Sequence, residues 1–160
     1  MSLISFIKEA GEKLFGKSAA AATNDAEKDA AANREAATAI EQHIAKFNFT
    51  VTALTVNFDV ATGTAKVFGV AADQETKEKV ILAAGNVAGV AAVQDMMTVD
   101  KSAPEAQYYS VVSGDTLSKI AKQFYGNAND YMRIFEANKP MLTHPDKIYP
   151  GQNLRIPPKS

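Results

Sequence analysis

The sequence of 160 residues has no cysteine, only two histidines and no run rich in lysine and arginine. A disulfide framework is therefore excluded, and His43 and His144 cannot supply a thiolate or imidazole zinc cluster. The formal net charge is -1, so neither nucleic acid nor an anionic membrane is expected as a partner. No apolar stretch is long enough to span a bilayer. With these classes excluded, we expect a soluble globular protein that is a monomer.

Residues 1–15 look like an export signal but lack its composition. The apolar run from Leu3 to Ile7 is broken by Lys8-Glu9, where a signal peptide would continue its hydrophobic region of roughly 7 to 15 residues. The spacing of the apolar residues suits a short amphipathic helix instead. We therefore predict a cytoplasmic protein in which segment 1–22 packs on the domain that follows.

Residues 23–99 have the pattern of a small α/β domain. The apolar period changes from 3.6 in the helices to 2 in the strands. The expected elements are a helix from Asn24 to about Phe47, strands over 54–60 and 64–71, a helix from Asp73 to about Ala84, and a strand over 90–99. Gly69 lies inside the second strand, where a glycine usually marks a bulge or a close approach of another backbone.

The two expected helices of this domain are amphipathic. In the first, the polar side holds Arg34, Glu41 and Lys46, with His43 as a surface residue. In the second, the residues expected to face inward are Val80, Ile81 and Ala84, and those expected to face solvent are Glu75, Lys77, Glu78 and Lys79.

Residues 108–158 read as a second small domain, after a charged linker over 100–107 that contains a proline. A strand opens it, Asp115 can cap a helix, and Gly126 stops that helix. A second helix ends at Asn138, and a last strand runs from Asn153 to Ile156. The order is strand, helix, helix, strand.

This second domain resembles the LysM family. The residues that carry the resemblance are Tyr109-x-Val111-x-Ser113-Gly114-Asp115-Thr116-Leu117, Tyr125-Gly126, Ile134-x-x-Ala137-Asn138 and Ile148-x-Pro150-Gly151-Gln152-x-Leu154-x-Ile156-Pro157. The resemblance implies a shallow groove, between the loops at 113–117 and 148–152, that binds N-acetylglucosamine polymers such as peptidoglycan. Binding of the cell wall is therefore one candidate function, although the same glycines and prolines also serve the turns of the fold.

The first domain resembles the BON family, on the residues Val67-x-Gly69, Gln74-x-x-Lys77 and Gly89-Val90-x-x-Val93. A BON domain followed by one LysM domain, behind the segment from Phe6 to Leu14, resembles the family of small bacterial cytosolic potassium-binding proteins. The expected fold class is thus α+β with two small domains: a BON sandwich of helix-strand-strand-helix-strand and a LysM unit of strand-helix-helix-strand.

A potassium site has a chemistry that side-chain motifs do not reveal. Proteins select K⁺ by replacing its water shell with several neutral carbonyl oxygens, which helix ends and glycine-bounded turns make available. Such stretches occur at 7–12 and 85–90, although glycines there can also simply end a helix. The resemblance points to the same stretches and implies K⁺ bound by the main-chain oxygens of Ile7, Ala10, Glu12, Gly85, Val87 and Val90.

The sequence patterns that could indicate catalysis or calcium binding are weak. Ser5 and Lys8 have a serine-lysine spacing, but no third group or oxyanion turn accompanies them. Asp25, Glu27 and Asp29 resemble the start of an EF-hand loop, which then lacks its glycine and its final glutamate. We therefore expect a binding protein and no enzyme.

Overall fold

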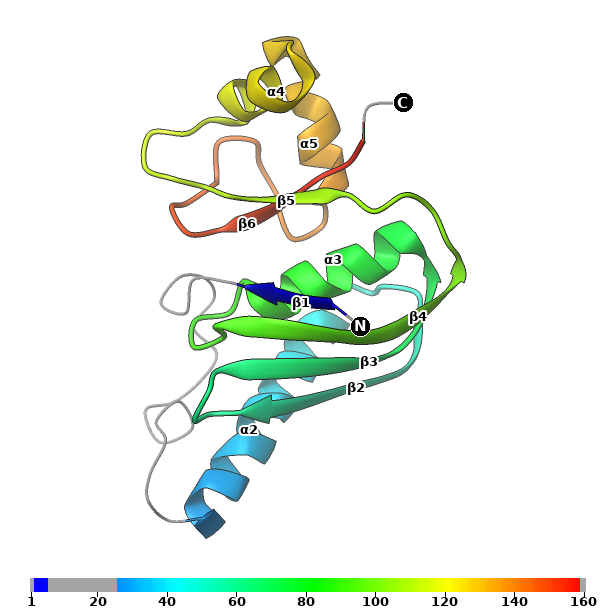
Figure 1. Ribbon diagram of the computed structural model, residues 1–160, viewed down its shortest axis with the longest axis vertical. Helices are drawn as coiled ribbons and strands as arrows, with labels where there is room; N and C mark the ends of the chain where they lie inside the picture. Colours follow the sequence, from blue (N-terminus) through cyan, green and yellow to red (C-terminus); the bar gives the residue numbers. More distant parts are fainter. Residues whose placement is uncertain (1, 6–25, 159–160) are drawn as a thin grey trace.

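The structure is a computed structural model that describes residues 2–5 and 26–158 (Figure 1). The first unit contains β1 (Ser2–Ser5), α2 (Ala26–Ala45), β2 (Val51–Asp59), β3 (Thr64–Asp73), α3 (Gln74–Gly85) and β4 (Ala92–Lys101). The second unit contains β5 (Gln107–Ser110), α4 (Leu117–Tyr125), the short 3-10 helix η1 (Ala128–Asp130), α5 (Tyr131–Ala137) and β6 (Asn153–Ile156). Among the described residues, no helix combines the length and the apolar composition needed to cross a bilayer. The mixture of helices and separate small sheets agrees with the expected α+β class.

The first unit is built on a four-stranded sheet of order β1-β4-β3-β2. Strands β2 and β3 form the expected antiparallel hairpin, whereas β3 and β4 run parallel and are joined through α3. Helices α2 and α3 share one core with the inward residues of the sheet. That core includes Ile40, Ile44, Val56, Phe58, Val67, Ile81 and Val93. Ala37 of α2 is also buried in this core.

Gly69 faces a β-bulge in β2, as the sequence predicts. The register between β2 and β3 shifts between Thr52 and Thr55, and Ala53 there has a φ of 57°. A Cβ added at Gly69, where φ is +146°, would lie 3.1 Å from Val51 Cγ1 and 3.2 Å from the Thr52 carbonyl oxygen. Glycine is therefore required by both the backbone conformation and the closeness of β2.

The prediction of an amphipathic helix at the start of the chain is wrong for Ser2–Ser5, which form strand β1. This strand pairs antiparallel with β4, with Ser2 opposite Asp95 and Ser5 opposite Ala92. The pairing satisfies main-chain groups along an edge of β4 that would otherwise lack partners, which outweighs a weak helical period. The sheet consequently has one strand more than the sequence pattern indicates. Residues 6–22 of the predicted segment lie outside the described part of the chain.

The second unit packs α4, η1 and α5 against the antiparallel pair of β5 and β6. Thr116, and not Asp115 as predicted, is the N-cap of α4, because its hydroxyl accepts from the Lys119 N–H. The Asp115 carboxylate instead accepts from the Tyr109 hydroxyl at 2.6 Å and from the Val112 N–H at 3.0 Å. The hydrogen bond from Tyr109 holds the pKa of Asp115 below its usual value, so the loop is braced by an ionised carboxylate.

Candidate functional site

The turn that follows α3 gathers three of the predicted oxygen donors. Helix α3 ends at Gly85, where the Asn86 N–H donates to the Leu82 carbonyl at 2.9 Å. The Val90 N–H donates to the Val87 carbonyl at 3.1 Å, and Gly89 has a φ of 104°. Gly85, Val87 and Val90 thus lie in one compact, buried turn. Ile7, Ala10 and Glu12 lie outside the described residues.

The electrostatics of this turn favour a cation held by neutral oxygens. The C-terminus of a helix carries a partial negative charge, and its last carbonyls lack partners within the helix. Over residues 2–5 and 26–158, no cluster of three or more His, Cys, Asp and Glu side chains could hold a metal ion. The main-chain oxygens at the end of α3 are of the neutral kind that suits a large monovalent cation.

The hairpin turn at Gly63 supports the turn after α3. The Ala91 N–H donates to the Gly63 carbonyl at 2.7 Å, and a Cβ added at Gly63 would lie 3.0 Å from the Gly89 carbonyl oxygen. Gly63 lies between the strands expected over 54–60 and 64–71, but the sequence pattern does not reveal this contact. Its conformation and its closeness to Gly89 both disfavour a side chain at this position.

Replacing Gly63 with alanine is expected to destabilise the protein by about 1–3 kcal/mol, through strain at a φ of +70° and a clash with the Gly89 carbonyl. Thermal denaturation measures the loss. Gly114→Ala is the matched control, because its φ is +91° but no atom lies within 4 Å of the added Cβ. We expect the smaller loss for Gly114→Ala, and equal losses would contradict the proposed crowding at Gly89.

Asn86 connects the turn after α3 to the second unit. Its side-chain Nδ2 donates to the Asn153 carbonyl at 2.8 Å, and its Oδ1 accepts from the Asn153 N–H at 2.9 Å. The side-chain amide thus pairs with the main chain of β6 as a neighbouring strand would. Asn138 does the same further along β6, where it pairs with the N–H and the carbonyl of Arg155.

The prediction that Glu78 faces solvent is wrong, since the side chain is almost wholly buried between the two units. Its Oε1 accepts from Arg155 Nε at 2.6 Å, and its Oε2 accepts from the Ala106 N–H at 2.9 Å and from Gln74 Nε2 at 3.1 Å. Tyr108 is partly buried beside this pair, and the loss of solvent raises its pKa far above the usual value, with the Glu78 charge as a further cause. Sequence periodicity missed Glu78 because its main partner, Arg155, lies 77 residues away.

The predicted glycan groove is only partly reproduced. A cleft of about 430 Å³ is lined by Thr116, Leu117, Ser118, Tyr131, His144, Pro145 and Asp146. The loop at 113–117 thus contributes to it, but Tyr149 and Gln152 of the other predicted loop line a different hollow. That hollow, of about 260 Å³, lies between the second unit and the helices α2 and α3, next to Asn86.

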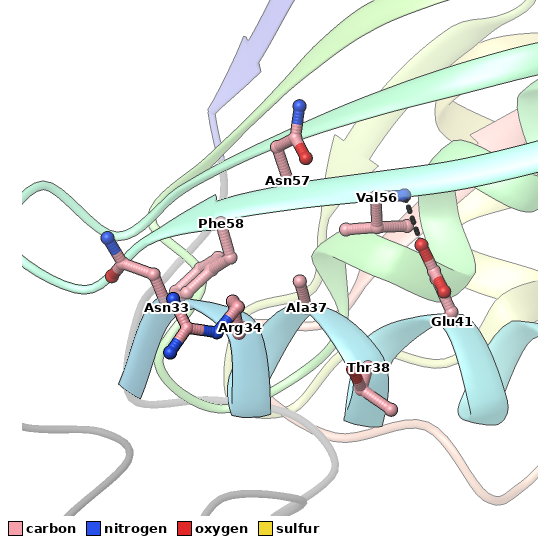
Figure 2. Close-up of a pocket in the computed structure, with 8 residues that line it drawn as sticks. All are labelled: Asn33, Arg34, Ala37, Thr38, Glu41, Val56, Asn57 and Phe58. Carbon is pink, nitrogen blue, oxygen red and sulfur yellow. Dashed lines mark hydrogen bonds between the residues drawn. The ribbon is translucent and has the colours of Figure 1, made fainter. Parts of the chain in front are cut away.

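Another hollow, of about 270 Å³, lies between α2 and the outer strand β2 (Figure 2). Glu41 was predicted to lie in solvent, but its Oε1 accepts from the Val56 N–H at 2.6 Å. Figure 2 shows this hydrogen bond as a dashed line. Asn33 Oδ1 likewise accepts from the Val60 N–H at 2.8 Å. Both side chains thus make hydrogen bonds that hold α2 against this edge of the sheet. The polar residues of this hollow therefore have a structural role.

A comparison with known protein families identifies one part of the chain. Residues 109–157 match the LysM domain family. The fold therefore defines a protein whose second unit is a LysM domain joined to a four-stranded α/β unit. The chain is 48% identical to the potassium binding protein Kbp of Escherichia coli O6:H1 (strain CFT073), over 98% of this chain and 99% of that protein. The chain belongs to the family of that protein.

Two further relatives share only part of the chain. An uncharacterized protein of Deinococcus radiodurans is 49% identical over 49 residues, which are 31% of this chain and 19% of that protein. The uncharacterized protein YqbP of Bacillus subtilis is 38% identical over 66 residues, which are 36% of this chain and 29% of that protein. Of these three alignments, the one with the Escherichia coli protein covers nearly the whole chain.

Proposed function

We propose that this protein is a cytoplasmic potassium sensor that binds K⁺ reversibly through main-chain oxygens, those of Ile7, Ala10, Glu12, Gly85, Val87 and Val90. The observation that carries the proposal is the 48% identity, over nearly the whole chain, to a protein named for potassium binding. The turn at 85–90 supports it, because a helix C-terminus presents neutral oxygens and a partial negative charge. In this proposal residues 23–99 form a BON domain, residues 108–158 form a LysM domain, and no reaction is catalysed.

The affinity that such a sensor needs is modest. A dissociation constant of 1 mM corresponds to a binding free energy of only about -4 kcal/mol, which a few well-aimed carbonyls can supply. The ion would order the turn at 85–90 together with the residues at 7–12, and the LysM domain docks on the side of that turn. Binding therefore changes the shape or the stability of the protein.

Potassium is expected to raise the melting temperature, while matched sodium and lithium salts are not. A ligand that binds only the folded state stabilises it by about 2.7 kcal/mol at 100 times its dissociation constant. Melting curves in KCl, NaCl and LiCl at constant ionic strength measure the effect and separate it from general screening. Identical curves in all three salts would refute the proposal.

A second candidate is binding of N-acetylglucosamine polymers such as peptidoglycan. The LysM match and the cleft between the start of α4 and the loop at 144–146 favour it. Co-sedimentation with purified peptidoglycan is the test. A wall-binding protein sediments with it whatever alkali cation is present, whereas a potassium sensor does not.

A further inference from the structure

Asn86 belongs to two parts of the structure at once. Its backbone lies between Gly85 and Val87, whose carbonyls are proposed to hold potassium, and its N–H closes the last turn of α3. Its side chain makes two hydrogen bonds with the main chain of Asn153, 67 residues away in the LysM domain. A shift of β6 therefore acts directly on the peptide units on either side of Asn86.

The LysM domain holds β6 in a defined place beside Asn86. The Glu78 carboxylate binds Arg155 of β6 and the N–H of Ala106, just before β5. Tyr108 and Met141 pack against the core of the first unit. On the far side of Arg155, the Asn138 side chain fixes the same strand to α5, through a hydrogen bond of 2.7 Å from Nδ2 to the Ile134 carbonyl. The strand that Asn86 contacts is thus held from several directions.

Two amide hydrogen bonds restrict Asn86 more tightly than one. A single bond lets the side chain rotate about it, whereas a reciprocal pair aligns the amide with the strand and fixes its orientation. Asn86 has a backbone conformation of φ -83° and ψ 39°, which lies outside the regular helical region. The pairing with β6 therefore holds a main-chain conformation that the helix alone does not impose.

We infer that Asn86 is a positioning residue for potassium: docked β6 holds the Asn86 side chain, and Asn86 in turn holds the Gly85 and Val87 carbonyls in the orientation that binds the ion. This inference rests on the proposed function and assigns a further residue to it. Because coupling between two binding events is reciprocal, potassium strengthens the docking of the LysM domain by the same factor by which docking strengthens potassium binding.

The test is a titration of the full chain with potassium, monitored by calorimetry. The dissociation constant of the variant Asn86→Ala is compared with that of the wild type. Loss of two hydrogen bonds is expected to weaken potassium binding about tenfold. The control is Asn127→Ala, which makes the same side-chain change at an exposed cap whose Oδ1 accepts from the Asn129 N–H within the LysM domain. An unchanged dissociation constant for Asn86→Ala would overturn the inference, provided that the wild type binds potassium. A wild type that does not respond to potassium refutes the proposed function itself.

Glu78→Gln provides an independent variant that leaves the turn untouched. It weakens the hydrogen bonds to Arg155 and Ala106 and so loosens the docking, while its shape is kept. Potassium binding is expected to weaken several-fold in this variant also. If both variants lower the melting temperature in NaCl but keep the wild-type dissociation constant, their role is merely structural and the inference fails.

Docking itself can be observed, because the chain has no cysteine of its own to interfere with labelling. Fluorophores on Thr55→Cys and Lys122→Cys, which are exposed positions in the two units, report the distance between them by energy transfer. Potassium is expected to narrow the distribution of distances in the wild type and to have a smaller effect in Asn86→Ala. Equal narrowing in both proteins would also contradict the inference.

Discussion

Replacing Arg155 with alanine is expected to destabilise the protein by about 3–5 kcal/mol, the usual cost of leaving a buried charge without its partner. The variant removes the guanidinium that donates to Glu78 at 2.6 Å and leaves that carboxylate almost wholly buried. The remaining donors, the Ala106 N–H and Gln74 Nε2, both bind the other carboxylate oxygen. Urea denaturation followed by circular dichroism measures the loss.

The double variant Glu78→Met with Arg155→Met is the informative control. Replacing both partners by apolar side chains of similar size removes the buried charge but leaves the Ala106 N–H without its acceptor, so a loss of about 2 kcal/mol, smaller than that of Arg155→Ala, is expected. A loss below about 1 kcal/mol for Arg155→Ala alone would mean that Glu78 reaches water in solution, and hence that the two units are separated there.

Asn138→Ala is expected to cost about 3 kcal/mol. The side chain is buried and makes hydrogen bonds with the Ile134 carbonyl, the Arg155 carbonyl and the Arg155 N–H. Alanine leaves these main-chain groups buried without a partner, which costs more than the hydrogen bonds themselves contribute. Thermal denaturation of the full chain measures the loss.

The comparison for Asn138 is again Asn127→Ala. That residue caps a short 3-10 helix at the surface, so its loss is expected to cost about 1 kcal/mol. Similar losses for the two variants would show that β6 keeps its hydrogen bonds without Asn138, for example by admitting water along its edge.

Local sequence patterns were sufficient to predict much of the fold. The hairpin, the bulge opposite Gly69, the cap at Asp73 and the strand Asn153–Ile156 all follow from residues near one another in the sequence. The LysM match likewise depends on turn residues at fixed spacing. These features are recognisable because glycine, proline and capping residues fix the backbone within a few positions.

The errors and omissions have a common physical cause, which is pairing between distant parts of the chain. Strand β1 exists because β4 offers it an edge, and Glu78 is buried because Arg155 reaches it from the other unit. Asn86 looks like an ordinary residue after a helix until β6 is placed beside it. In the candidate site, the turn at 85–90 could be predicted from its glycines, but the neighbours that support it, Gly63 and Asn153, could not.

The position of β2 at the edge of the sheet bears on whether the protein aggregates at high concentration. An unpaired edge strand is a template on which a strand of another molecule can add, and this is a common route to aggregation. Here Asn33 and Glu41 of α2 already accept from the Val60 and Val56 N–H groups along that edge. A second molecule would have to displace both side chains before pairing, so the helix that completes the core also discourages fibre-like growth from this side of the sheet.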